Sequence, residues 1–171
     1  MDVMAAIQGR RSIRNYSTRE VEEEKLNRVL EAARLAPSAN NRQNWRFIVV
    51  RDEELRKKMT EASFGQQFVG GAPVVIVACG TDPSGVMRCG QYRYTIDLSI
   101  AVSYMTLEAY EQGLGTCWIG SFDEGMVKKL LNIPDTVRAV AITPLGYPAE
   151  SPAPRPRKSL SEIVCYDKYQ E

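Results

Sequence analysis

Residues 72–80 of the chain read APVVIVACG. Every side chain between Pro73 and Gly80 is apolar, and most of them branch at Cβ. A short, uninterrupted apolar run rich in β-branched residues predicts a strand that is buried on both faces of a sheet. The chain on either side of this strand must then supply the other strands and the helices that cover them.

The segments before this strand alternate between helical and extended patterns. A Ser/Thr start, early acids and a stop before Pro37 predict a helix, and Asp52 suits the N-cap of another. We expect helices at 2–9, 17–37 and 52–63, a polar loop at 37–44 and a strand at 45–51.

The segments after the strand include the longest helix that the sequence predicts. It runs from about residue 94 to 112 and ends before Gly113. Its apolar residues cover most of its circumference, so the helix is central in the domain or lies at a subunit interface. We also expect a loop at 81–91, a short strand at 115–122, a helix at 123–134 and a strand at 137–148.

Helices and strands mix without strict alternation, which favours an α+β domain over a regular doubly wound fold. No repeat or linker divides the chain, so residues 1–171 are expected to form one domain. The tail from residue 149 opens with prolines at alternate positions and ends in apolar and aromatic residues. Such groups are uncommon in disordered tails. We therefore expect an arm that packs on another surface, plausibly a partner subunit.

Composition limits the possible partners. The chain has 171 residues, 44% of them hydrophobic, and a formal net charge of +1. That balance does not indicate nucleic acid or a membrane surface as a partner. No secretory leader is recognisable and the apolar runs are too short to span a bilayer, so we expect a cytoplasmic protein.

The absence of histidine restricts the chemistry. The commonest general base and the usual hydrolase triads are unavailable. The four cysteines lie far apart without a metal-binding spacing, so no metal site is expected. Cys79 and Cys117 lie in apolar surroundings and are expected to be buried. The chemistry therefore does not depend on a side-chain nucleophile.

Two basic clusters could bind an anion. The first comprises Arg10, Arg11, Ser12 and Arg14, and the second lies in PRPRK, residues 154–158. Guanidinium groups can bind phosphate bidentately, although two solvated surface patches would look the same in sequence. If residues 11–14 are extended, Ser12 and Arg14 share one face and Ile13 points inward.

Two further segments fit the same ligand. The loop PSANNRQN, residues 37–44, carries amide groups that can bond a ring edge, and GLGTCWIGSF, residues 113–122, has glycines that permit close backbone approach. Taken alone, each also reads as an ordinary loop. Together the four features suggest a mononucleotide with a planar heterocycle.

Five stretches in this order make the chain similar to a known family: RRSIRNY, APSANNRQNWRF, GQQFVGGAPVVIV, GLGTCWIGSF and PRPRKSLSEIV. The chain resembles the FMN-dependent nitroreductases in their short form, from about residue 7 to 169. The resemblance implies an α+β fold with a mixed, mostly antiparallel sheet of about four to five strands flanked by helices. It also implies a long central helix at the interface of a homodimer, an extended C-terminal arm, and FMN between the subunits.

The resemblance also implies roles for individual residues. Arg10 and Ser12 would serve the phosphate and ribityl chain, and Arg14 the pyrimidine side of the ring. Gln66 would bond the pyrimidine edge, and the Gly120 backbone N–H would face flavin N5. The other expected FMN-binding residues are Arg11, Ile119, Ser121, Arg155 and Arg157, with Pro37, Ser38, Ala39 and Asn41 supplied by the other subunit.

The reaction that the resemblance implies is a two-step exchange. NADH or NADPH gives a hydride to flavin N5, and an acceptor such as a nitroaromatic or a quinone then takes two electrons at the same place. Three alternatives remain open: a flavin-binding sensor or carrier without turnover, a specialised family reaction such as dehalogenation or flavin fragmentation, and a non-flavin interaction module. Two departures stand out, namely Asn44 where many relatives have proline, and the short segment 81–94 where longer relatives carry a helical excursion.

Overall fold

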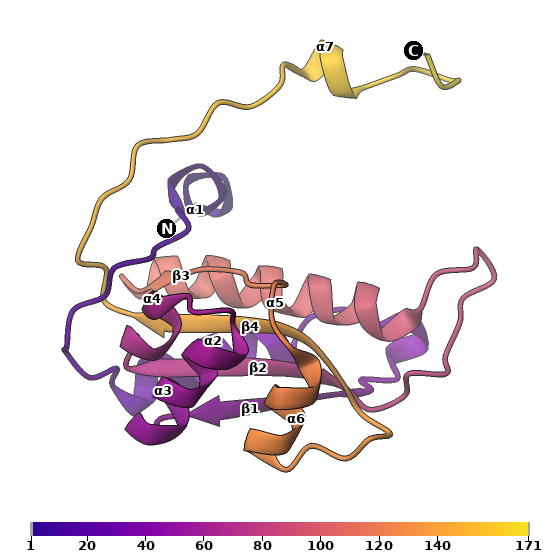
Figure 1. Cartoon of the computed structure of the whole chain (residues 1–171). Helices are drawn as coiled ribbons and strands as arrows, with labels where there is room; N and C mark the ends of the chain where they lie inside the picture. The colour runs from indigo at the N-terminus through magenta and orange to yellow at the C-terminus, as the bar shows by residue number, and fades with distance from the viewer. Residues whose placement is uncertain (1, 171) are drawn as a thin grey trace.

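The computed structural model describes residues 2–170 and has an α+β fold built on one four-stranded sheet (Figure 1). The strand order is β1-β2-β4-β3, and all three pairings between these strands are antiparallel. The strands are β1 (Trp45–Val50), β2 (Val74–Gly80), β3 (Gly115–Thr116) and β4 (Arg138–Gly146). Residues 74–80 of the run APVVIVACG form β2, and every residue of β2 is buried, as its sequence predicts.

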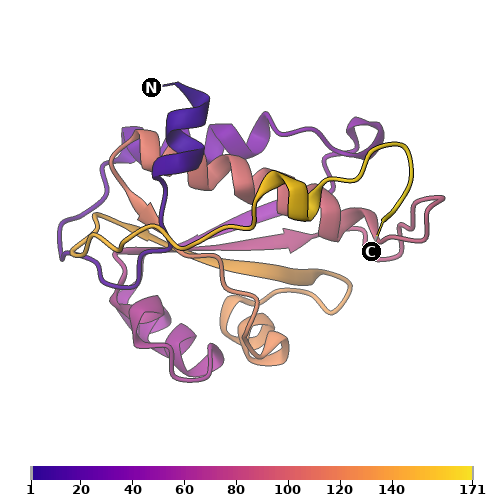
Figure 2. The ribbon, with the colours of Figure 1, turned by 90° about the horizontal axis from the view of Figure 1, so that it is seen from above.

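Helices cover both faces of the sheet (Figures 1 and 2). The alternation along β2 explains this, because successive side chains point to opposite faces. Val74 and Ile76 belong to the core beneath α2 and α5, whereas Val75 and Val77 belong to the core beneath α3, α4 and α6. The helices are α1 (Val3–Gly9), α2 (Glu23–Arg34), η1 (Ala39–Asn41), α3 (Glu53–Ala62), α4 (Gln67–Gly71), α5 (Arg93–Glu111), α6 (Glu124–Leu131) and α7 (Leu160–Ile163).

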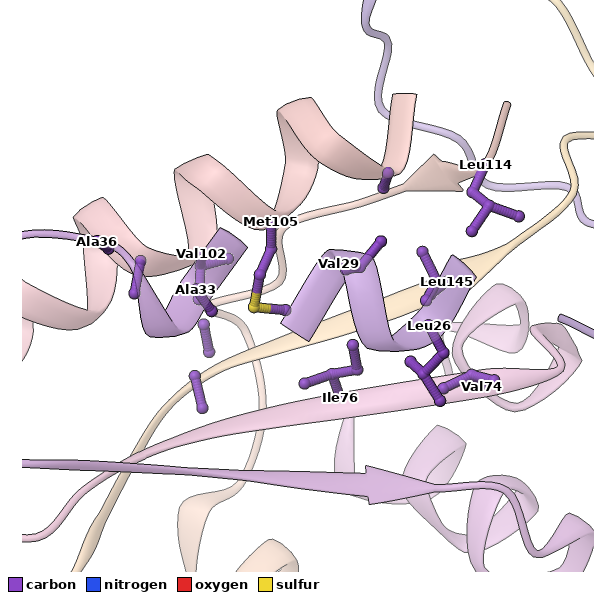
Figure 3. Packing of buried hydrophobic residues seen from close by; sticks show 14 of the residues in the cluster. Leu26, Val29, Ala33, Ala36, Val74, Ile76, Val102, Met105, Leu114 and Leu145 are labelled. Atoms are coloured by element: carbon purple, nitrogen blue, oxygen red, sulfur yellow. The ribbon is translucent and has the colours of Figure 1, made fainter. Parts of the chain in front are cut away.

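The core on the α5 side is a layer of buried aliphatic side chains (Figure 3). Val29 of α2 and Val102 and Met105 of α5 are fully buried there, over Ile76 of the sheet. Burying side chains of this size stabilises the fold by roughly 1.5–3 kcal/mol each. The inner side of α5 is thereby fixed, while Ile96 and Tyr104 on its outer side remain exposed.

Most predicted elements appear. Two of them differ in extent, and two short helices were not predicted. The helix predicted at 17–37 is α2 and begins only at Glu23, because Tyr16 and Ser17 instead pair with Pro148 and Tyr147. The strand expected at 115–122 is regular only at Gly115–Thr116. The short helices α4 and α7 lie where no helix was expected. Asp52 caps α3, as predicted, by accepting a hydrogen bond from the Leu55 N–H at 2.8 Å.

The C-terminal arm leaves the sheet beside α1 and runs outward in an extended form (Figures 1 and 2). Residues 153–170 are all exposed, among them Leu160, Tyr166 and Tyr169. Beyond residue 152, the described part of the arm is therefore not covered by the rest of residues 2–170. None of the helices within residues 2–170 is both long and apolar enough to cross a membrane.

Candidate cofactor site

The two basic clusters, far apart in sequence, line one groove. Its volume is about 790 Å³, and it lies between the strand-like segment after α1 and the root of the C-terminal arm. The lining residues are Ile7, Gln8, Arg10, Arg11, Ser12, Arg14, Glu150, Pro152, Ala153, Pro154, Arg155 and Arg157. We call this the arginine groove. Its five guanidinium groups come from both ends of the chain.

Backbone pairing explains why the clusters meet. The Ser17 N–H donates to the Tyr147 carbonyl and the Ala149 N–H donates to the Asn15 carbonyl, each at 2.9 Å. The segment before them is also extended, since the Ile13 N–H donates to the Thr116 carbonyl at 2.9 Å. Ile13 is buried, whereas Ser12 and Arg14 are exposed, as the predicted alternation requires.

The arginines of the groove form no ion pairs within the described chain, although Glu150 lies among the lining residues. Within residues 2–170, no ion pair joins Arg10, Arg11, Arg14, Arg155 or Arg157 to a carboxylate. Guanidinium groups gathered in this way repel one another and favour an anion that can share their donors. The set fits a phosphate group, and the Ser12 hydroxyl adds a further donor.

Arg11 is tied to the helix that precedes it. Its Nη1 donates to the carbonyls of Gln8, Gly9 and Arg10 at 2.7, 2.9 and 2.9 Å. These carbonyls lie at the C-terminal end of α1, where carbonyl groups have no hydrogen-bond donor within the helix. The Arg11 guanidinium, which was expected to face the cofactor, thus caps the C-terminal end of α1. Its role toward FMN stays a prediction.

A second surface surrounds Gly120. Ile119 is held to Ile142 by two backbone hydrogen bonds of 2.9 and 3.0 Å. A Cβ placed on Gly120 would meet no atom within 4 Å, so the backbone there lies open. Gln66 secures the next residue, because its Nε2 donates to the Ser121 carbonyl at 3.1 Å. An exposed backbone beside a fixed segment suits the close approach of a planar ring.

Arg14 lies between the groove and this surface. Its Cζ is 5.8 Å from the centre of the Phe68 ring, within cation–π range. Burial raises the pKa of the nearby Cys117 thiol, while Arg14, a hydrogen bond with Ser12, and Arg10 act to lower it. These contacts connect the groove to the segment that leads to Gly120. Cys79 and Cys117 are both buried, as predicted.

The segment Pro37–Asn41 lies elsewhere. The Ala39 N–H donates to Asp97 Oδ1 at 3.0 Å, near the start of α5, whereas Gly9 contacts Tyr110 near its end. Thirteen residues of helix separate those points, or about 20 Å. The Ser38 hydroxyl accepts from the Gln43 N–H and the Asn41 carbonyl from Gln43 Nε2, each at 3.1 Å. One chain therefore does not bring Pro37, Ser38, Ala39 and Asn41 to the groove.

Two residues of this region were not singled out in the sequence. Phe68 supports Arg14, and Glu150 places a carboxylate inside the arginine groove. Glu150 precedes the PRPRK run by only four positions, in AESPAPRPRK, so proximity to that run was the available signal.

Comparison with known proteins shows the family of the chain. The model of the nitroreductase family matches residues 7–83 and 64–147, which together span most of the chain. The chain belongs to the nitroreductase family. A protein of Methanothermobacter thermautotrophicus, provisionally named NADH dehydrogenase/NAD(P)H nitroreductase, is 40% identical over 160 residues. That match covers 91% of this nitroreductase-family chain and 82% of the relative.

Solved structures of the family share the fold. A nitroreductase family protein from Clostridium difficile 630 is 34% identical with a TM-score of 0.89, and the match covers 99% of this chain and 100% of that one. An FMN-dependent nitroreductase from Clostridium difficile R20291 is 30% identical with a TM-score of 0.83, and the match covers 97% of this chain and 99% of that one. The expected family, its α+β fold and its class, an oxidoreductase, are confirmed.

Proposed function

We propose that this nitroreductase-family chain is an FMN-dependent NAD(P)H oxidoreductase that acts as a homodimer on small nitroaromatic or quinone acceptors. One observation carries the proposal. Two arginine clusters that form no ion pair within the described residues converge on one groove, and Ser12 of that groove pairs with Thr116, four positions before the open backbone at Gly120. A phosphate and a planar ring joined by a short chain would satisfy both features together.

The phosphate end is assigned to side chains from both ends of the chain. Arg10, Arg155 and Arg157 would hold the phosphate, and the Ser12 hydroxyl would bond the phosphate or the ribityl chain. Arginine suits this task because its fork of donors matches phosphate oxygens and keeps its charge at any physiological pH.

The ring end is assigned to the surface around Gly120. FMN, when bound, supplies hydride chemistry that no side chain of this histidine-free protein can supply. Arg14 would place a fixed positive charge at the pyrimidine edge, where Phe68 supports it. Ile119, Gly120 and Ser121 would offer backbone N–H groups, and Gln66 holds that segment in place through the Ser121 carbonyl.

A homodimer is supported by the outer face of α5. The hydroxyls of Thr95, Ser99 and Ser103 donate to carbonyls of their own helix, those of Tyr92, Thr95 and Ser99, at 2.8, 2.6 and 2.7 Å. This stripe therefore presents small side chains with satisfied hydroxyls, beside exposed Ile96 and Tyr104. A second copy packed there would cover this face. The segment Pro37–Asn41, at the far end of α5, could then serve the partner's groove.

The choice of reductant and acceptor is inferred from the family. The relatives' names assign NAD(P)H nitroreductase and FMN-dependent nitroreductase activities to those proteins.

Three measurements test the proposal in sequence. The purified protein should carry FMN or take it up on titration. Stopped-flow mixing with NADH or NADPH should then bleach the bound flavin, and a nitroaromatic or quinone should restore its colour. A colourless protein that binds no FMN would exclude the proposed function. A bound flavin that neither NADH nor NADPH reduces would instead identify a carrier or sensor.

A further inference from the structure

A carboxylate occupies a groove that otherwise collects arginines. Glu150 lines the arginine groove, yet its carboxylate forms no ion pair with a described arginine. Its Oε1 instead accepts hydrogen bonds from the backbone N–H groups of Arg14 at 2.5 Å and Asn15 at 3.1 Å. A negative charge at a phosphate site opposes binding. The retained carboxylate therefore needs a contribution that offsets this cost.

The position of these two bonds indicates such a contribution. Toward the sheet, Ser17 pairs with Tyr147 and Asn15 pairs with Ala149, so the two strands run side by side. Beyond Ala149, the side chain of Glu150 continues this pairing by accepting from the backbone N–H groups of Arg14 and Asn15. From residue 151 to Lys158, no hydrogen bond within the described chain ties the arm back to the rest of the protein. The Glu150 carboxylate is thus the final anchor before Arg155 and Arg157.

The same bonds also fix the other arginine cluster. They hold the backbone of Arg14 and Asn15, and Arg14 is the residue whose guanidinium lies over Phe68. One side chain therefore sets the relative placement of an N-terminal and a C-terminal cluster. Because bidentate phosphate binding requires donors at defined positions, a small displacement of either cluster weakens it.

We propose that Glu150 is a positioning residue that fixes the two arginine clusters around the cofactor phosphate. The proposal rests on the proposed function, because it takes the phosphate of FMN as the anion in the groove. It predicts that the reach of the Glu150 side chain matters more than its charge.

Two conservative variants separate reach from charge. Glu150→Gln keeps a carbonyl oxygen at the same distance from the backbone N–H groups and removes the charge. Glu150→Asp keeps the charge and shortens the side chain by one methylene group. If Glu150 were only a counter-charge, Gln would strengthen phosphate binding strongly and Asp would change nothing.

The test measures the dissociation constants of FMN and of riboflavin, which lacks the phosphate, for the dimeric full-length chain. The ratio of the riboflavin constant to the FMN constant isolates the phosphate contribution. We expect Glu150→Asp to lower this ratio about tenfold, with riboflavin binding nearly unchanged, as the loss of donors to a charged group implies. Glu150→Gln should keep the ratio at or above the wild-type value.

Three results would overturn the positioning role. These are an unchanged ratio in Glu150→Asp, a ratio in Glu150→Gln that falls as far as in Glu150→Asp, or equal losses of riboflavin and FMN affinity in both variants. The proposed function fails in a different way, which the wild-type protein alone reveals. In that case the wild type would bind neither flavin, or would bind FMN no more tightly than riboflavin.

Discussion

Gln66 Nε2 donates a hydrogen bond across 3.1 Å to the carbonyl oxygen of Ser121, and a second one across 3.0 Å to the carbonyl oxygen of Ser63. The amide therefore joins the start of α4 to the segment that leads from Gly120 to α6. The Nε2 donors are thus used by carbonyls of the protein and the side chain fixes backbone, so a bond from Gln66 to the flavin pyrimidine edge stays a prediction that Oε1 would have to satisfy.

Replacing Gln66 with leucine should loosen the Gly120–Ser121 segment. A lost hydrogen bond of this kind costs about 1 kcal/mol, so we expect a five-fold or greater loss of FMN affinity. Isothermal titration with FMN checks this. Gln67→Leu is the matched control, because Gln67 is exposed and its side chain donates only to the nearby Gly65 carbonyl at 3.3 Å. Equal effects of the two substitutions would contradict the role of Gln66.

Arg157→Ala should weaken the retention of FMN without changing the fold. A hydrogen bond to a charged group contributes about 1.5–3 kcal/mol, which corresponds to a loss of affinity of tenfold or more. The loss should shrink at high salt, because the groove acts partly through its charge. Arg34→Ala removes an equally exposed arginine that pairs with Glu31 on α2 and should leave FMN binding unchanged. Unaltered affinity in Arg157→Ala would place this residue outside the site.

Arg14→Ala should lower the two-electron reduction potential of bound FMN. A fixed positive charge near the ring favours the more negative reduced form, so its removal favours the oxidised form. Losing about 1.4 kcal/mol of differential stabilisation shifts a two-electron couple by about 30 mV. The potential is measured with dye equilibration at saturating FMN, and Arg14→Lys serves as the control that keeps the charge. A potential that stays the same in Arg14→Ala would remove Arg14 from the ring edge.

The sequence could predict the core and the composition of the groove, because both follow from local patterns. The β-branched run of β2 specifies a buried strand by itself, and the alternation at 12–14 correctly places Ile13 inside. The true start of α2 could not be read locally, since Ser17 is held by Tyr147 from the other end of the chain. The hydrogen bonds of Glu150 could not be predicted from the sequence for the same reason, because their donors are backbone N–H groups more than a hundred residues away.

Alkaline pH should destabilise the protein through Cys79. Burial raises the pKa of this thiol from its ordinary value of 9.0 to about 11, with a further contribution from Glu124 that Lys128 opposes. The folded state holds the proton more tightly than the unfolded state, so this contribution is complete below pH 9 and is lost as the pH rises to about 11. Each pKa unit corresponds to 1.36 kcal/mol, so the loss is about 2–3 kcal/mol.

Urea unfolding at several pH values measures this contribution. Cys79→Ala removes the titrating thiol and should flatten the fall in unfolding free energy between pH 9 and 11. Cys165→Ala removes an exposed thiol and should keep the wild-type slope. Identical slopes in all three proteins would show that other groups cause the alkaline loss.

Ser103→Arg should separate the proposed dimer and, with it, the cofactor site. The Ser103 side chain lies on the outer stripe of α5 with Thr95 and Ser99, and none of these side chains is a carboxylate that could pair with an added guanidinium. Burying an unpaired guanidinium at a helix–helix contact costs several kcal/mol, which exceeds what a dimer of moderate affinity can absorb.

Sedimentation of the Ser103→Arg protein should therefore show a monomer. FMN affinity should fall in the same variant, because the proposal assigns Pro37–Asn41, at the far end of α5 from the groove of its own chain, to the flavin of the partner. Glu61→Arg, on the exposed face of α3, is the control with the same added side chain and should remain dimeric and flavin-bound. A monomeric Ser103→Arg protein that binds FMN as tightly as the wild type would show that one chain holds the cofactor alone.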